Sequence, residues 1–281
     1  MVLLLPTAIS MFAGKVGGTN YTAPGVFNFS LPQLMGKLFV GNYDSITNSG
    51  LPSIFCSVSA TVLVLLFFLH KGFSVKDKLM AGGVLLFFIL SFSFKHLDMA
   101  WHMFQYPNWF PYRYAFVFCF FVLALSYRTF LKLAQIEWWK IAAVLGFLLI
   151  AATGVKLIGG DDLVSWESYG ATVALLVVYS GILLGLRFKV KAATVWMVVL
   201  LVAAAGEGYY NAGKMIEGLD GQFHYKTLEN YTGFQKEMQP LVEKMQQDSG
   251  AFYRVRKTFE RSKNDALNLG YKGITHYSSV Y

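Results

Sequence analysis

The run IAAVLGFLLIAATGVKLI, Ile141–Ile158, is 18 residues long and carries a single charge. An α-helix of roughly this length crosses the hydrocarbon core of a bilayer. The whole chain of 281 residues has the same character, since 55% of it is hydrophobic and only 14% is charged. Its mean hydropathy is +0.46. This composition excludes a soluble globular domain and predicts a membrane protein.

Five other apolar stretches of comparable length lie on either side of this run. They are Leu51–His70, Leu79–Phe94, Arg113–Phe130, Tyr169–Leu186 and Ala192–Gly213. A seventh, Val2–Ala13, is short, contains Pro6 and lacks the basic start of a signal peptide, so we interpret it as part of a helix that begins before Met1. We therefore expect an all-α polytopic membrane protein with about seven transmembrane segments, the first truncated, over residues 1–213.

The basic residues predict the orientation of these segments. One set occupies three short connections, and it comprises Lys71, Lys76, Lys78, Arg128, Lys132, Lys140, Arg187, Lys189 and Lys191. By the positive-inside rule these connections are cytoplasmic, which places the region after Gly213 outside the cell. The net charge of +8 then reflects orientation in the membrane, and we expect no nucleic-acid partner.

Two regions outside the apolar stretches have patterns of their own. The connection Lys15–Gly50 contains LPQLMGKLFVG, which predicts a hairpin or a surface helix. Residues 214–281 are more polar, and Phe234, Met238, Leu241, Val242 and Met245 share one helical face there. FYRVRKTF, Phe252–Phe259, predicts a short strand. We expect an extracytoplasmic α+β domain that starts at residue 214 and is truncated at Tyr281 before its core closes.

The stretch QYPNWFPYRYAF, Gln105–Phe116, interrupts the apolar pattern. Pro107 and Pro111 exclude a continuous helix, so irregular backbone is expected between two spans. One interpretation is a belt of aromatic anchors at the membrane interface with Arg113 reaching outward. The other is a binding site, because polar residues crowd the same connection. They are His96, Asp98, His102, Gln105, Asn108 and Arg113.

The run WHMFQYPNWFPYRYAFVFCFFVLAL, Trp101–Leu125, resembles the signature of the bacterial YfhO family of membrane proteins. Glu207, Asn211, FYRV at Phe252–Val255 and NDALNLGYKGITHYSS at Asn264–Ser279 resemble later landmarks of that family, in the same order. The resemblance implies a GT-C-type glycosyltransferase. Such an enzyme takes a sugar from a polyprenyl-phosphate carrier at the outer face of the bacterial cell membrane and transfers it to a cell-envelope acceptor such as lipoteichoic acid.

The resemblance also suggests roles for individual residues. The catalytic acid of this class is expected before Met1, so we expect the fragment alone to be inactive, with Asp98 as a candidate base or a solvated loop acid. Arg113 is the candidate for the carrier phosphate, since a guanidinium binds two oxygens in a fork. His102, Gln105 and Asn108 could bond sugar hydroxyls, and Trp109 and Tyr112 could face the sugar or the prenyl tail. We expect no cofactor and no metal, because the spacing of His96 and His102 fits no metal site well.

Two further features stay open between a functional and a structural interpretation. Glu207 is an acid within an apolar helix, which makes it a functional candidate, and Asn211 lies one turn further on and could share its partner. The paired acids of GGDDLVSWES, Gly159–Ser168, could bind a cation or form a solvated turn.

Two other function classes compete with a transferase. A lipid or solute transporter would carry polar residues near the midplane of several helices, whereas here the polar groups gather at one outer face. A membrane anchor that displays the external domain has no use for a polar loop with two prolines. The transferase is therefore the preferred prediction, with the lipid bilayer, a carrier-linked sugar and an envelope polymer as partners.

Overall fold

The structure, a computed structural model, describes residues 26–47, 50–102, 107, 109–188, 192–248, 253–259, 261–262 and 264–274. It divides into two units, residues 19–222 and a second unit that includes residues 223–281. We call them the bundle unit and the C-terminal unit. The regular secondary structure of the described residues is helical in both units, and the β-structure there consists of isolated bridges.

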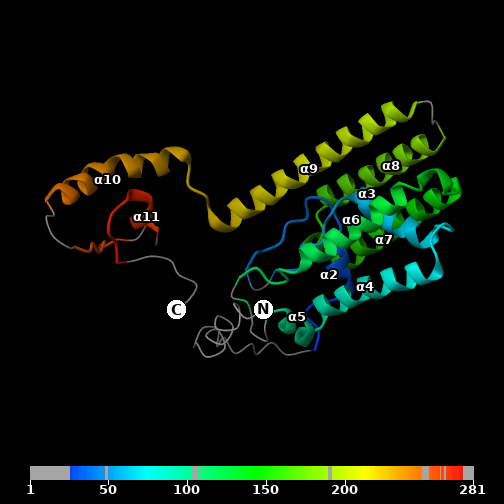
Figure 1. Cartoon of the computed structure of the whole chain (residues 1–281), viewed down its shortest axis with the longest axis horizontal. Coiled ribbons are helices and arrows are strands. Elements are labelled where there is room, and N and C mark those ends of the chain that lie inside the picture. The colour runs from blue at the N-terminus through cyan, green and yellow to red at the C-terminus, as the bar shows by residue number, and fades with distance from the viewer. Residues whose placement is uncertain are drawn as a thin grey trace. The chain divides into compact units, whose positions relative to one another are not determined.

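A helix lies within or across each of the six apolar stretches predicted for residues 51–213 (Figure 1). These helices are α3 (Val58–Leu69), α4 (Val75–Ser93), α6 (Ala115–Phe130), α7 (Trp138–Leu163), α8 (Trp166–Phe188) and α9 (Ala193–Phe223). By length and composition, α7, α8 and α9 are able to span a membrane, while α3 and α6 are shorter apolar helices. The prediction of an all-helical membrane protein is confirmed, with three spans long enough among the described residues.

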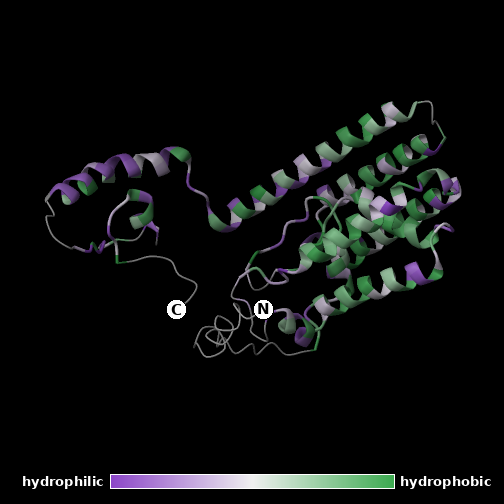
Figure 2. Ribbon diagram, viewed as in Figure 1, coloured by the Kyte–Doolittle hydropathy of each residue, from purple (hydrophilic) through white to green (hydrophobic). Residues whose placement is uncertain are grey.

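Helix α3 is at the centre of the bundle unit. It packs against α6, α7 and α8, and Val62, Leu66 and Phe67 on it are fully buried. Val62 and Leu66 pack in one apolar cluster with Tyr179 of α8 and Ile141 of α7, while Phe67 belongs to a second cluster with residues of α4 and α6. In Figure 2 the helices of this unit are coloured mainly as apolar, on outward as well as inward faces. An apolar exterior is what contact with lipid requires.

Helix α3 begins later than the apolar stretch that contains it. The stretch starts at Leu51, but the helix starts at Val58 and the residues before it are not helical. The Ser57 side chain accepts a hydrogen bond from the Ser59 N–H, and the Val58 N–H donates to Glu207 of α9 at 2.7 Å. The start of α3 is therefore determined by a partner far along the chain, because backbone donors at a helix N-terminus need acceptors.

The piece LPQLMGKLFVG forms a short helix, α2 (Leu31–Gly36), that packs against α7. A Cβ added at Gly36 would lie 3.1 Å from the Leu163 side chain, so the two helices approach closely there. Further on, Phe39 packs with Ala152 and Val155 of α7 in one apolar cluster. The predicted surface helix is thus buried on one side by the bundle.

The stretch GGDDLVSWES lies mainly in helices. Helix α7 continues to Leu163 across a kink at Gly160, whose φ of 63° favours glycine. Lys156 is buried, pairs with Asp161 and donates to the Val164 carbonyl at 2.7 Å. The acid at position 161 therefore serves an ion pair next to the kink.

In the C-terminal unit the predicted helix is confirmed as part of α10 (Leu228–Asp248), and a short α11 (Asp265–Leu269) follows. Val242 of α10 packs with Leu269 and Tyr271. The predicted strand is wrong, because Val255 makes only an isolated bridge with Gly273. A strand needs a ladder of successive paired residues, and no second bridge continues this one among the described residues.

Candidate functional site

A cavity of about 770 Å³ lies between the connection 44–53 and the residues at the start of α6. Its size is that of a small-ligand site. We call it the loop cavity. It is lined by Asp44, Ser45, Ile46, Leu51, Ser53, Phe110, Pro111, Tyr112, Arg113, Ala115, Phe116 and Cys119.

The wall before α6 has an unusual backbone. Phe110 and Tyr112 both have a φ of 55°, a left-handed conformation that costs a residue with a Cβ about 1–2 kcal/mol. Hydrogen bonds hold this backbone: the Phe110 N–H donates to the Ile46 carbonyl at 2.8 Å. The Arg113 Nε donates to the Phe110 carbonyl at 3.2 Å, and its NH2 group donates to the Trp109 carbonyl at 2.9 Å. Strain that surroundings maintain in this way is typical of functional sites.

These contacts use only some of the hydrogen-bond donors of Arg113. Of the five N–H donors of a guanidinium, one on Nε and one on NH2 bind backbone carbonyls. Among the described residues, Arg113 has no carboxylate partner and no further hydrogen bond. The side chain is exposed and lines the loop cavity. The edge formed by NH1 and the second N–H of NH2 is therefore available to an anion.

The opposite wall is built around Asp44. Its Oδ2 lies 3.1 Å from the Lys37 Nζ and accepts from the Leu51 N–H at 3.1 Å. Its Oδ1 accepts from the Ser45 N–H at 2.7 Å. Lys37 is buried, and burial lowers its pKa while Asp44 opposes that shift. This wall presents the Ser45 and Ser53 side chains and an acid to the cavity.

A buried polar group lies close to Arg113 in the sequence but outside the cavity lining. Asp98, on the short helix α5 (Lys95–Trp101), is 5% exposed and accepts from the Tyr114 hydroxyl at 3.1 Å. His102 Nε2 lies 3.7 Å from the Asp98 Oδ1 and has no hydrogen bond to any residue that the structure describes. Burial raises the pKa of Asp98 to about 7, and burial and the charge of Arg113 lower the pKa of His102.

Glu207 and Asn211 bind protein groups at separate places. Glu207 is 5% exposed, and it accepts hydrogen bonds from the Ser57 hydroxyl at 2.7 Å and the Tyr179 hydroxyl at 2.5 Å, besides the Val58 N–H. Asn211 Oδ1 accepts from the Gly41 N–H at 2.9 Å. They do not share a partner, and neither lines the loop cavity. Carrier binding by this pair stays a prediction.

The structure brings together some of the predicted site residues. Arg113 and Tyr112 line the loop cavity, and Trp109 lies beside them through its carbonyl. Gln105 and Asn108 lie outside the described residues. Asp44, Ser45 and Ser53 were not predicted, because a connection rich in Ser and Asn has the same sequence pattern whether or not it lines a cavity.

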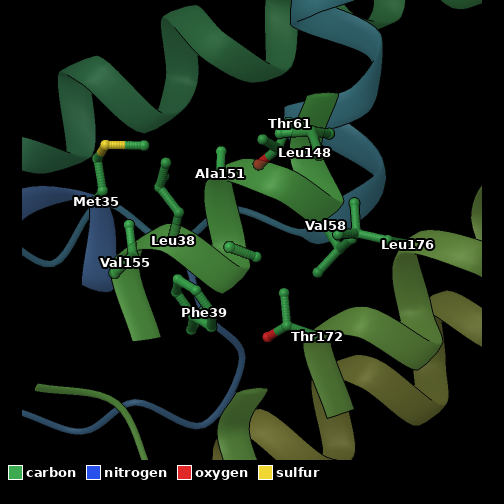
Figure 3. A pocket seen from close by; sticks show the side chains of 11 residues that line it. Met35, Leu38, Phe39, Val58, Thr61, Leu148, Ala151, Val155, Thr172 and Leu176 are labelled. Atoms are coloured by element: carbon green, nitrogen blue, oxygen red, sulfur yellow. The ribbon is translucent and has the colours of Figure 1, made fainter. Parts of the chain in front are cut away.

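A second pocket, deep among α2, α3, α7 and α8, is of a different kind (Figure 3). Its volume is about 50 Å³ and its lining is almost entirely apolar. Its two hydroxyl groups are engaged, since Thr61 donates to the Ser57 carbonyl at 3.3 Å and Thr172 accepts from the Val40 N–H at 3.1 Å. This pocket is too small and too apolar to orient a sugar.

Comparison with known proteins places the chain in a family. The model of one protein family, described as bacterial membrane protein YfhO, matches residues 1–281. No curated protein and no solved structure matches the chain. Among the described residues, no group of three or more His, Cys, Asp or Glu side chains could hold a metal ion.

Proposed function

This chain belongs to the YfhO family of bacterial membrane proteins, and from that premise we propose that it forms part of a membrane glycosyltransferase. The reaction transfers a sugar from a polyprenyl-phosphate carrier to a cell-envelope acceptor such as teichoic acid. The observation that carries the proposal is Arg113, a cation with unused donors facing a cavity of about 770 Å³.

The free edge of Arg113 suits a carrier phosphate. NH1 and NH2 together can donate two parallel hydrogen bonds to two phosphate oxygens. The other edge is bound to the carbonyls of Trp109 and Phe110, which orients the guanidinium before the ligand arrives. An orientation fixed in advance reduces the entropy lost on binding.

The two walls offer different chemistry to the rest of the ligand. Ser45, Ser53 and Asp44 could bond sugar hydroxyls, while Phe110 and Phe116 give apolar surface for a ring face or the prenyl chain. The Phe110 and Phe116 rings are 50% and 72% exposed, so they are open to such contacts.

In the proposed reaction an acceptor hydroxyl attacks the anomeric carbon of the sugar. The bond between that carbon and the carrier phosphate oxygen breaks, and the phosphate leaves with an additional negative charge. Arg113 stabilises that developing charge, which lowers the barrier to transfer. The hydroxyl proton passes to a base, for which Asp98 is the candidate within this chain.

The orientation belongs to the same proposal. The connections around Lys76, Lys132 and Lys189 are cytoplasmic, and the loop cavity and the region after Gly213 face outward, where carrier-linked sugars are used. Single cysteines at these three positions, with Cys56 and Cys119 changed to serine, test this in intact cells. Labelling of Lys189→Cys by a membrane-impermeant thiol reagent contradicts the orientation.

The function is tested with variants of Arg113 in the complete protein. We expect Arg113→Ala to lower carrier affinity by about 10- to 1000-fold, since each charge-assisted hydrogen bond contributes roughly 1.5–3 kcal/mol. The carrier affinity of Arg113→Lys should lie between those of Arg113→Ala and the parent, because a lysine keeps the charge but cannot donate two parallel hydrogen bonds. The measurement is sugar transfer against titrated carrier, with thermal unfolding as the check on folding.

A matched control is available at the other end of α6. Arg128 lies 3.8 Å from Asp77 and over the Phe73 ring, far along the helix from the cavity lining. Arg128→Ala should leave carrier affinity unchanged. If Arg113→Ala used the carrier like the parent, Arg113 would not be the phosphate site. The stretch Gln105–Phe116 would then be interpreted as a belt of aromatic anchors at the membrane interface.

A further inference from the structure

The connection that forms one wall of the loop cavity is bound to the end of α9. Gln222, in the last turn of that helix, accepts a hydrogen bond from the Tyr43 hydroxyl at 2.5 Å. Its Nε2 donates to the Ser45 Oγ at 2.8 Å, and its Oε1 lies 3.5 Å from the Ile46 N–H. The side-chain amide of Gln222 thus contacts three residues of the segment 43–46. Two of them, Ser45 and Ile46, line the cavity.

The same face of α9 is shaped for this segment. Asn211, Gly218 and Gln222 are spaced seven and four residues apart, which puts them on one side of a helix. Gly218 has no side chain where the Tyr43 ring packs, and a Cβ there would lie 2.3 Å from that ring. Asn211 holds the Gly41 N–H, where φ is +69°. The segment 41–46 therefore packs against α9 at three residues of that helix, Asn211, Gly218 and Gln222.

Hydrogen bonds continue from this segment to Arg113. The Ile46 carbonyl accepts from the Phe110 N–H at 2.8 Å, and the Phe110 carbonyl accepts from Arg113 Nε at 3.2 Å. Gln222 is thereby linked to Arg113 through the segment 43–46 and the left-handed residue Phe110. These bonds hold the backbone of Phe110 on both sides, so loss of the contact between Gln222 and the segment 43–46 should let Phe110 and Arg113 shift.

We propose that Gln222 is a positioning residue of the loop cavity, which sets the orientation of Arg113 through Ser45, Ile46 and Phe110. This proposal rests on the proposed function only for its effect on transfer; the effect on cavity geometry is independent of it. A glutamine suits the task because one uncharged group supplies both the acceptor for Tyr43 and the donor for Ser45.

The geometry is tested without any substrate. The complete protein is labelled with 5-fluorotryptophan, and the resonance of Trp109 is assigned with Trp109→Phe. Trp109 is the right reporter because its carbonyl accepts from Arg113. We expect Gln222→Ala to shift or broaden this resonance. Gly218→Ala should do the same while leaving Gln222 intact, because the added methyl group displaces Tyr43.

The matched control is Glu217→Gln. Glu217 lies on α9 near Gln222 but pairs with Lys214 at 3.1 Å, and among the described residues it has no hydrogen bond or ion pair with the cavity wall. The Trp109 resonance should be unchanged in this variant. An unchanged resonance in both Gln222→Ala and Gly218→Ala, with folded protein, overturns the proposal.

Carrier titration separates this proposal from the function on which it rests. We expect Gln222→Ala to raise the KM for a polyprenyl-phosphate sugar about 10-fold, with a smaller change in kcat, since the bond lost is to a neutral partner. A resonance shift in a protein that does not bind carrier at all contradicts the proposed function alone. Parent-like KM together with a shifted resonance overturns the positioning role.

Discussion

Both ends of the bundle unit carry charged side chains, but these side chains have different surroundings at the two ends. At the end that carries the short basic connections, which we call the basic end, Glu137 pairs with both Lys71 and Lys140. There the Lys132 Nζ donates to the Gly72 carbonyl at 2.8 Å, and the Arg187 Nε donates to the Ile136 carbonyl at 2.8 Å. These side chains close helix ends and hold connections together.

At the loop cavity, by contrast, a cation keeps donors that no described residue uses, beside backbone in a strained conformation. What distinguishes the loop cavity is that a cavity of about 770 Å³ and strained backbone lie beside the unused donors of its cation. We expect substitutions at the basic end and at Glu207 to lower the stability of the fold. Substitutions at the loop cavity should instead lower sugar transfer.

The largest effect on stability is expected from Glu207→Ala. The variant removes the acceptor of the Val58 N–H and the Tyr179 hydroxyl, while the Ser57 hydroxyl keeps its contact with the Ser59 hydroxyl. Each unsatisfied buried donor costs about 1–3 kcal/mol, so the loss should be on the order of 3 kcal/mol or more. Thermal unfolding in detergent measures it, with Glu217→Ala on the same helix as the control.

Glu207→Gln separates the structural from the functional interpretation of this acid. The amide nitrogen cannot accept from the donors that surround it, although hydroxyl groups can turn to adjust. We expect reduced stability and, in the protein that remains folded, transfer per molecule close to that of the parent. Lost transfer with parent-like stability would instead make Glu207 part of the site.

This case also shows how far the sequence reaches. Apolar length predicts where the helices lie, because lipid demands it of each segment separately. The start of α3 at Val58 depends on Glu207, which is 149 residues away in the sequence. The wall of Asp44, Ser45 and Ser53 likewise depends on contacts with α9 that no local pattern records. The position of Arg113 in irregular backbone was predictable because prolines and aromatic residues surround it in the sequence, and its role in carrier binding stays a prediction.

The second effect concerns Asp98, next to the cavity lining. Its pKa of about 7 in the fold lies above the ordinary 3.8 because burial disfavours the charged form. The unfolded chain therefore ionises first as pH rises, and stability falls between about pH 4 and pH 7. Asp98→Asn removes this dependence and should be more stable than the parent at pH 8, by up to about 4 kcal/mol.

Thermal unfolding of the parent and Asp98→Asn from pH 5 to pH 8 measures this effect. The difference between the two proteins should grow from pH 5 to about pH 7, where Asp98 ionises in the fold, and change little above that pH. A parent whose stability rises with pH over this range would show that Asp98 is held ionised, with His102 as its partner at 3.7 Å.

A smaller effect is expected at the basic end. Hydrogen bonds from Lys140 and Lys71 lower the pKa of Glu137 to about 2, so this carboxylate is ionised at neutral pH. Glu137→Gln should lower the melting temperature slightly, because buried Lys140 loses its anion. Carrier affinity should be unchanged. If Glu137→Gln lowered carrier affinity in protein that is still folded, the basic end would also take part in transfer, and the proposed difference between the two ends would be wrong.

The smallest effect isolates the backbone strain beside Arg113. Phe110 is 50% exposed with a φ of 55°, so both Phe110→Ala and Phe110→Gly remove the ring, and only glycine also removes the penalty of a Cβ in that conformation. We expect Phe110→Gly to be more stable than Phe110→Ala by about 1 kcal/mol. Sugar transfer should be slower in Phe110→Gly than in Phe110→Ala, because the more flexible glycine backbone orients Arg113 less well. Thermal unfolding and carrier titration of this matched pair measure both quantities. Equal stability would mean that position 110 stores no strain, and Arg113 would then owe its orientation to its own two hydrogen bonds.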